Sequence, residues 1–486
     1  MMGTCELRYG LRGLRKDAGF TALVILILAL GIGATTVIFS VVKAVLLDPL
    51  PYRNADSLAR LWESSDARGV AQGPVSVPNF EDWRRHQASF EQLAASEMAT
   101  FTLTGSGDAE RLAAARITAN LLPALGIVPV VGRTFLPEDE RAGASKVALL
   151  GYGVWQRRFG GDPSIVGRSI QLNGDSVAVV GIMPVEFDFP TARELWVPLV
   201  IDPAREPWRA DRSNRNLAVF GRLKAGVPLA SAIADLKRVG ATLAATYPGT
   251  NDGWSVRGSS FKEWLVPAPV RHATLVLFAA VGLLLLLTCA NVANLQLART
   301  VARQREMATH AALGATRARL VRQLLFESLA LALAGGVAGA TVAHWSISAI
   351  NTVVIPEIPQ LQHMTVDVTV LGFAVAVSVA TGLFFGLVPA WWTSRHGLSN
   401  RLREGASTGG PRTQRMRGVL VSLQIGLTVT VVVIGALLVR SFVELQRVPL
   451  GFRTENVLTF QVNLPEPAYG TPERRVAFYE TWFTRL

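Results

Sequence analysis

The residues that could carry out catalysis in this sequence form few of the known patterns. The stretch GASTG, Gly405–Gly409, matches the G-x-S-x-G pattern of a nucleophilic serine, which requires a strand before the serine and a helix after it. It follows RLRE and precedes GPRTQR, so a flexible basic linker is the better interpretation. The phosphate-binding pattern G-x-x-x-x-G-K-[ST], HExxH and CxxC are absent, and the six histidines are scattered singly. We therefore expect no catalytic residue, cofactor site or metal site, and no ATPase site of the usual kind.

A second group of candidate functional residues consists of polar side chains within long apolar runs. Asn291, Asn294 and His344 lie in such runs, where they either hydrogen-bond between helices or line a conduit. Two small-residue patterns, Gly335-xxx-Gly339 and Gly382-xxx-Gly386, predict helix faces that allow close approach of a neighbouring helix.

The apolar runs that carry these residues are long enough to cross a membrane. Half of the residues are hydrophobic and only 17% are charged, which disfavours an ordinary soluble protein. A span needs roughly 20 apolar residues. Five runs qualify, and we number them as spans one to five: 20–47, 273–298, 329–354, 366–392 and 419–443. Residues 1–19 precede them as an amphipathic helix at the membrane surface, in contact with lipids.

The positions of the basic residues predict the orientation of the spans. The net charge of +12 is concentrated in alternate loops. Basic residues lie before the first span, between the second and third, and in the linker 393–418, whereas the turn IPEIPQLQH between the third and fourth has no Lys or Arg. The positive-inside rule therefore places the N-terminus in the cytoplasm and residues 48–271 outside. This distribution also argues against nucleic acid as a partner.

The outer segment, 48–271, is expected to fold as a mixed α/β domain. Alternating apolar residues on both sides of Asn173-Gly174 predict a β-hairpin. An apolar stripe at helical period, ended by Tyr247-Pro248, predicts a helix through Leu229, Ile233, Leu236, Val239 and Leu243.

An internal repeat relates the two ends of the chain. DPLPYRNADSL and VPLGFRTENVL share five matched positions at an offset of 400 residues, from Pro49 and Pro449 onward, and each follows a long apolar run. The fifth span, 419–443, thus corresponds to the first, and residues 444–486 begin a second outer domain. We expect the chain to be an N-terminal fragment that pairs with its own missing second half as a pseudo-dimer. The fifth span should then pack less closely than the other four, and Val457–Val462 should have few strand partners.

An arginine-dense stretch, RQREMATHAALGATRARLVRQLLFES, separates the second and third spans. Residues 299–313 predict a helix that Gly314 would end, and a second helix would run through Leu320, Leu324 and Glu327 into the third span. The arginines either set the topology alone or belong to a short helix pair, joined to a span, that acts as a lever.

This stretch resembles the coupling segment of FtsX/MacB-type ABC transporter permeases. The outer segment resembles the MacB periplasmic domain in GRTFLPEDER, VVGIMP and LWVPL, and LALGIGATTVIFSVVKAVLLDPLPY resembles the duplicated acidobacterial orphan permeases. The resemblance implies a multi-pass α-helical membrane protein with an inserted mixed α/β periplasmic domain of MacB type, and an FtsX-like permease domain over 272–392. It assigns the coupling segment, 299–328, to docking of an ATPase, with seven positions carried over: Arg303, Arg305, Glu306, Leu313, Gly314, Gln323 and Glu327.

The resemblance implies a permease subunit of the mechanotransmission kind in the bacterial inner membrane. A cytoplasmic ABC ATPase dimer would close on ATP, and the spans would move the periplasmic domain to export a substrate, with a periplasmic adaptor as a further partner. His310 stands where the family pattern has arginine, which removes one fixed charge. The alternative is an ATPase-independent scaffold or regulator that binds periplasmic or cell-wall partners.

Overall fold

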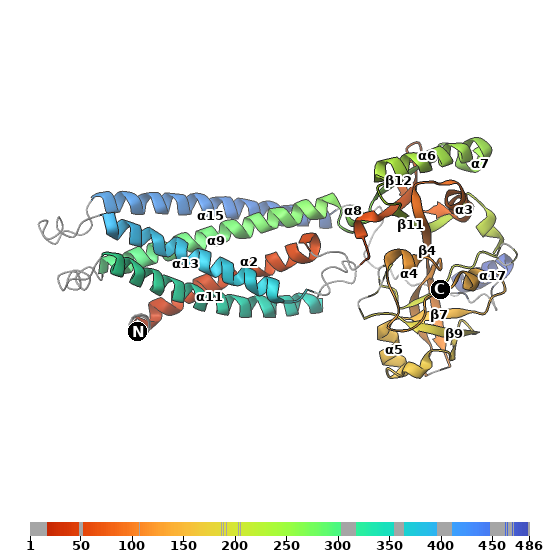
Figure 1. Ribbon diagram of the computed structural model, residues 1–486, viewed down its shortest axis with the longest axis horizontal. Helices are drawn as coiled ribbons and strands as arrows, with labels where there is room; N and C mark the ends of the chain where they lie inside the picture. Colours follow the sequence, from red (N-terminus) through yellow and green to blue (C-terminus); the bar gives the residue numbers. More distant parts are fainter. Residues whose placement is uncertain are drawn as a thin grey trace, which may run out of the picture. The chain divides into compact units, whose positions relative to one another are not determined.

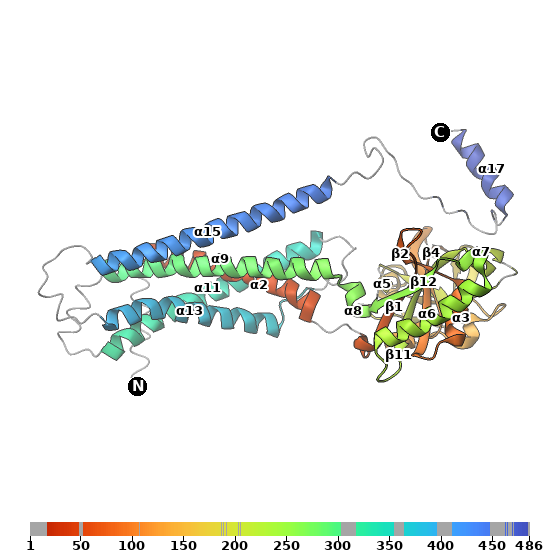
Figure 2. The same cartoon turned by 90° about the horizontal axis from the view of Figure 1, so that it is seen from above.

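The fold is described from a computed structural model, which consists of two compact parts (Figures 1 and 2). One part comprises Met1–Asp48 and Ala268–Arg453, and the other comprises Pro49–Pro267 and Thr454–Leu486. The structure describes residues 17–47, 52–302 except 106, 186, 188, 191, 203 and 205, then 317–353, 364–395, 411–447, 462, 464, 469 and 471–484. The predicted surface helix at 1–19 and the run Val457–Val462 lie almost wholly outside the described residues.

The first part is a bundle of long helices. Their bounds are α2 Ala18–Val42, extended by the π-helical turn η1 Lys43–Leu47, then α9 Ala268–Ala302, α11 Arg317–Val353, α13 Val368–Arg395 and α15 Pro411–Gln446. Each contains a stretch long and apolar enough to cross a membrane: Ala18–Leu47, Ala268–Arg299, Leu325–Asn351, Val368–Leu387 and Val421–Glu444. Within the described ranges, these five helices confirm the five predicted spans and their order.

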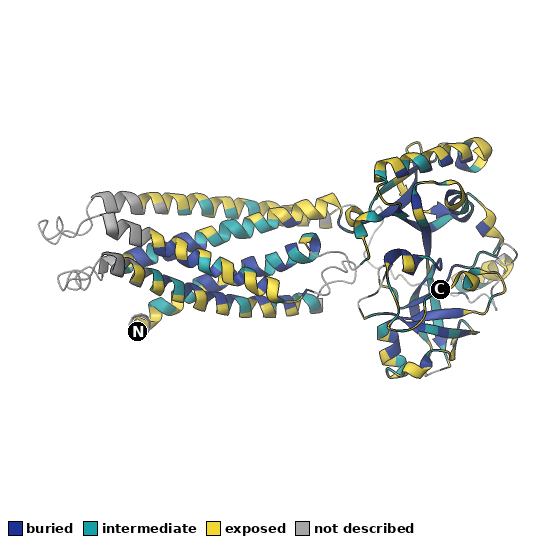
Figure 3. Cartoon of the chain, in the orientation of Figure 1, coloured by how far each residue is buried: buried dark blue, intermediate teal, exposed yellow. Residues whose placement is uncertain are grey.

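Glycines allow the first, third and fourth spans to pack closely. A side chain at Gly335 of α11 would place its Cβ atom 2.5 Å from Cβ of Leu28 in α2. On α13, a Cβ at Gly382 would lie 2.9 Å from Cβ of Ala332 in α11. Both small-residue patterns therefore serve helix packing, as the sequence predicted. The buried residues of α2, α9, α11 and α13 gather along these contacts (Figure 3).

The fifth span, in α15, is the least enclosed of the five. It lies along α9 in Figures 1 and 2, and none of its described side chains is buried, whereas each of the other four spans has buried residues. This agrees with the looser packing expected for it.

The second part contains a mixed sheet covered by short helices. The strand order is β12-β1-β11-β4-β5-β10-β7-β9-β6, and β10 with β5 and β7 with β9 are its parallel pairs among the described residues. The strands are β1 Leu58–Ser65, β2 Val70–Gly73, β3 Val75–Ser76, β4 Phe90–Thr104, β5 Glu110–Ile117, β6 Val131–Gly132, β7 Val147–Leu150, β8 Ser169–Leu172, β9 Asp175–Ile182, β10 Leu195–Pro198, β11 Arg215–Leu223 and β12 Ser255–Ser260. The helices are α3 Val77–His86, α4 Leu121–Leu125, α5 Tyr152–Phe159, α6 Leu229–Thr246, α7 Pro248–Asn251, α8 Phe261–Leu265 and, near the C-terminus, α17 Pro472–Phe483.

The two local predictions in this domain are confirmed. Strands β8 and β9 pair antiparallel around Asn173 and Gly174, whose φ angles of 52° and 87° are those of a two-residue hairpin turn. Asn173 also accepts a hydrogen bond from the backbone of Thr102 in β4 at 2.8 Å. The helix α6 buries Leu236, Val239 and Leu243 against the sheet.

Candidate functional site

The predicted coupling segment joins two of the longest helices in the chain. Helix α9 ends at Ala302 and α11 begins at Arg317. Arg303, Arg305, Glu306, Leu313 and Gly314 lie between them, outside the described residues. The last two predicted positions, Gln323 and Glu327, lie in the first turns of α11, where the side chain of Glu327 is half-buried. Because α11 continues without interruption into the third span, the predicted helix through Glu327 is confirmed.

An ion pair joins α9 to the beginning of α2 at the first residue of the predicted coupling segment, Arg299. The guanidinium of Arg299 lies 2.9 Å from the carboxylate of Asp17 and 4.7 Å from the ring centre of Phe20. The Arg299 side chain is 9% exposed and that of Asp17 is 45% exposed, so water reaches the carboxylate side of the pair. Together with Leu295 and Ala298, these residues line an open groove. The first and second spans are thus joined where the predicted coupling segment begins.

Sequence reasoning assigned Arg299 to the basic loop and did not select it as a site residue. One signal was available, because Asp17 is the sole acidic residue between Arg8 and the first span. An isolated carboxylate at the start of a span requires a cationic partner nearby. The sequence offers many arginines for this role, and the structure selects Arg299.

The amides within the spans form a cluster between two helices. Asn294 of α9 donates to the side-chain oxygen of Gln424 in α15 at 2.9 Å, and the Gln424 amide donates to the oxygen of Asn291. Interhelical hydrogen bonding, one of the two roles considered for these asparagines, is therefore confirmed. His344 lies apart from them, with an exposed side chain on α11.

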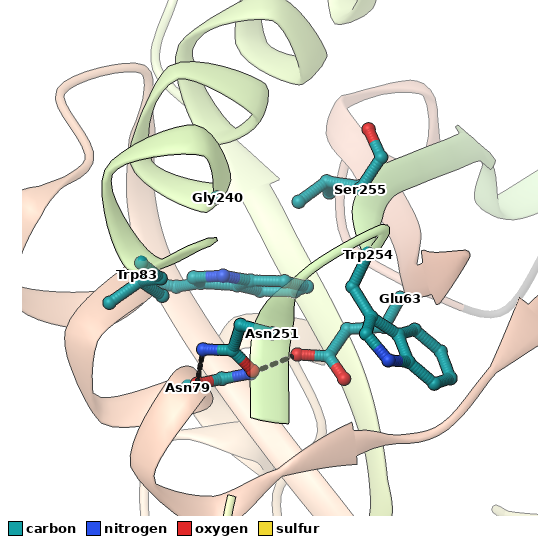
Figure 4. Close-up of a pocket in the computed structure, with 9 residues that line it drawn as sticks. Glu63, Asn79, Trp83, Gly240, Asn251, Trp254 and Ser255 are labelled. Atoms are coloured by element: carbon teal, nitrogen blue, oxygen red, sulfur yellow. Dashed lines mark hydrogen bonds between the residues drawn. The ribbon is translucent and has the colours of Figure 1, made fainter. Parts of the chain in front are cut away.

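The mixed α/β domain contains a buried polar cluster beside a small recess (Figure 4). Asn79 of α3 donates to the carboxylate of Glu63 in β1 at 2.5 Å, and its amide also bonds to Asn251 of α7 at 3.1 Å. Arg215 of β11 forms an ion pair with Glu63 and stacks 3.8 Å from the ring centre of Trp254. Burial raises the pKa of the Glu63 carboxyl, against the opposing effect of the Arg215 charge. Because these groups bond chiefly to one another, the cluster joins strands and helices and leaves few polar groups to face a ligand.

A metal centre has no support among the described residues, where no three His, Cys, Asp or Glu side chains gather within reach of one ion.

Two family models match the chain in consecutive segments. The MacB-like periplasmic core domain matches residues 21–239, and the FtsX-like permease C-terminal domain matches residues 278–399. The first segment contains most of the first span and the α/β domain from β1 through most of α6, and it ends before β12. The second contains the later part of the second span, the predicted coupling segment, and the third and fourth spans.

Several curated proteins are similar to this chain. The macrolide export ATP-binding/permease protein MacB of Chlorobium luteolum is 28% identical over 389 residues, which are 76% of this chain and 54% of that protein. An uncharacterized ABC transporter permease of Bacillus subtilis, YknZ, is 25% identical over 264 residues, or 53% of this chain and 62% of that protein. The pyoverdine export protein PvdT of Pseudomonas entomophila is 27% identical over 278 residues. The chain thus spans only about half the length of the MacB protein.

Solved structures of outer domains also align with the chain. The periplasmic region of MacB from Actinobacillus actinomycetemcomitans aligns at 11% identity and a TM-score of 0.34, covering 48% of this chain and 98% of that structure. The extracellular domain of YknZ aligns at 14% identity and a TM-score of 0.32, covering 41% and 99%.

Five membrane helices, an inserted mixed α/β domain and the two matching family models agree with one another. The chain belongs to the FtsX/MacB-type permeases of ABC transporters.

Proposed function

We propose that this permease is the mechanotransmission subunit of an export system in the bacterial inner membrane. In this proposal a cytoplasmic ATPase dimer docks on the segment around Leu313 and Gly314, and its closure on ATP moves the spans that lead to the α/β domain. Relatives are named for macrolide and pyoverdine export, which supports export as the direction of transport.

The observation that carries this proposal is the continuity of the two helices that flank the coupling segment. Helix α9 extends from Ala302 back to Ala268, only three residues after α8 of the α/β domain ends at Leu265. Its 35 residues correspond to roughly 52 Å at 1.5 Å per residue. An unbroken helix transmits displacement along its length, and the Asp17–Arg299 pair joins the first span to the same movement.

Substitution of Leu313 by glutamate should weaken association with the ATPase, because it places a charge on the expected apolar contact. The effect should exceed about tenfold in the amount of ATPase that co-purifies from native membranes, since burying an unpaired charge costs several kcal/mol. Gly314→Val should impair stimulated ATP hydrolysis if Gly314 has the left-handed conformation expected past a helix end.

As a control, Arg257→Met, on the exposed side of β12, should leave co-purification of the ATPase unchanged. Co-purification of an ATPase with the unsubstituted chain, unaffected by Leu313→Glu, would contradict the docking role. If no nucleotide-binding subunit co-purifies with the unsubstituted chain, the ATPase-independent scaffold is favoured, in line with His310 in place of arginine.

The orientation in the membrane can be tested with single cysteines in a chain whose native cysteines, Cys5 and Cys289, are replaced by serine. Ser176→Cys lies on the exposed face of β9 and should react with an impermeant thiol reagent in cells with a permeabilised outer membrane. Ser407→Cys, in the basic linker, should react only after the inner membrane is opened. The reverse labelling pattern would contradict a cytoplasmic N-terminus.

A further inference from the structure

The amide cluster joins the fifth span to the second within the apolar part of the bundle. Asn291 and Asn294 lie in the span Ala268–Arg299, and Gln424 lies in the span Val421–Glu444. The three side chains are partly buried and bonded to one another as described above. In hydrocarbon, an amide that loses its partner has no water to replace it.

The rest of the fifth span contacts its neighbour through one narrow stripe. Partly buried residues recur every three or four positions from the amide, at Gln424, Leu427, Val431 and Ile434, and Val443 follows further along the helix. Lipid tails are as apolar as these aliphatic side chains, so burying them against another helix gives little preference for one partner. The amides are therefore the part of this contact that distinguishes α9 from another apolar surface.

The internal repeat supplies a competitor for the same position. At the offset of 400 residues, Gln424 corresponds to Val24 of the first span. Val24 is fully buried in a cluster with Val292 and Ala293 of α9. Two spans related by the repeat thus meet α9 at the same level, one through an aliphatic contact and the other through amides.

We propose that Asn291, Asn294 and Gln424 are specificity-determining residues that direct the fifth span, and not the first, to this face of the second span. A valine at that position would leave the two asparagines without their partner, which penalises the exchanged arrangement. This inference is independent of the proposed ATPase coupling.

The test uses the full-length chain in native membranes, with Cys5 and Cys289 replaced by serine. Leu287→Cys lies on the face of Asn291 and Asn294, four and seven residues before them, and Leu427→Cys lies one turn from Gln424. A bifunctional thiosulfonate should bridge this pair. Gln424→Val should lower the bridged fraction about fivefold, because two interhelical bonds of modest strength are lost. Gln424→Asn, which keeps an amide, should retain more bridging than Gln424→Val.

A second cysteine pair shows whether the bundle itself remains intact. Phe39 and Phe373 stack with ring centres 3.8 Å apart between α2 and α13, so Phe39→Cys with Phe373→Cys should bridge equally with or without Gln424→Val. Unchanged bridging between positions 287 and 427 in Gln424→Val would overturn the proposal.

If Gln424→Val also lowers bridging between positions 39 and 373, the test uses the triple variant Asn291→Leu/Asn294→Leu/Gln424→Leu instead. It removes the amides without leaving one unpaired, so the bundle should fold. Its bridged fraction between 287 and 427 should fall as in Gln424→Val, and a value equal to that of the unsubstituted chain would overturn the proposal.

Discussion

Replacement of Gly335 by leucine is expected to prevent the third span from packing on the first and to leave little folded permease. The new Cβ would lie 2.5 Å from Cβ of Leu28, and one turn later Gly339 already lies close to the backbone of Ala29 and Gly33. Because neither helix can move without losing the contacts of the other turns, the cost should exceed the roughly 1 to 3 kcal/mol of ordinary overpacking.

This prediction can be measured as thermal stability and monodispersity of the detergent-solubilised chain. The matched control is Gly372→Leu in α13, since a Cβ at Gly372 has no heavy atom within 4 Å. We expect the control to accumulate and melt like the unsubstituted protein. A Gly335→Leu protein that does the same would show that the close contact between α2 and α11 is not required.

Substitution of Arg215 by methionine should destabilise the α/β domain by about 3 to 5 kcal/mol, because it leaves a buried carboxylate without its ion-pair partner. Only 4% of the Glu63 side chain is exposed, so water cannot replace the lost guanidinium. Thermal unfolding followed by tryptophan fluorescence is a suitable measurement, since Trp83 and Trp254 line the adjacent recess. Adding Glu63→Gln to Arg215→Met should recover part of the loss by removing the charge.

The loss of stability caused by Arg215→Met should also depend on pH. A carboxyl whose pKa is raised in the folded state contributes its full stability below the unfolded pKa, about 4.3, and loses it as the pH rises through the folded pKa. Burial raises the pKa of Glu63, and removal of Arg215 takes away the main opposing charge. The variant should therefore be more destabilised at pH 8 than at pH 5, and the opposite trend would contradict this account.

An exposed ion pair provides the control for this substitution. Arg257 pairs with Asp66 at 2.7 Å, but 86% of the Asp66 side chain is exposed. Arg257→Met should change the free energy of unfolding by less than about 1 kcal/mol.

The sequence determined the features that arise from local pattern and composition. The five spans follow from apolar length, since crossing a bilayer imposes a requirement on each segment separately. The hairpin at Asn173-Gly174 and the helix from Leu229 follow from turn chemistry and periodicity, which involve neighbouring residues. The glycine patterns on the third and fourth spans predicted close packing, although they did not indicate which helix would approach.

Only the tertiary structure decided the partners of the polar side chains. Gln424 lies 130 residues from Asn294, and Arg215 lies 152 residues from Glu63, so no local pattern relates them. A buried amide or carboxylate requires a partner, but many residues in the chain have suitable chemistry. The choice among them is made by the packing of whole helices and strands, which brings one arginine or one glutamine within hydrogen-bond distance and keeps the others away.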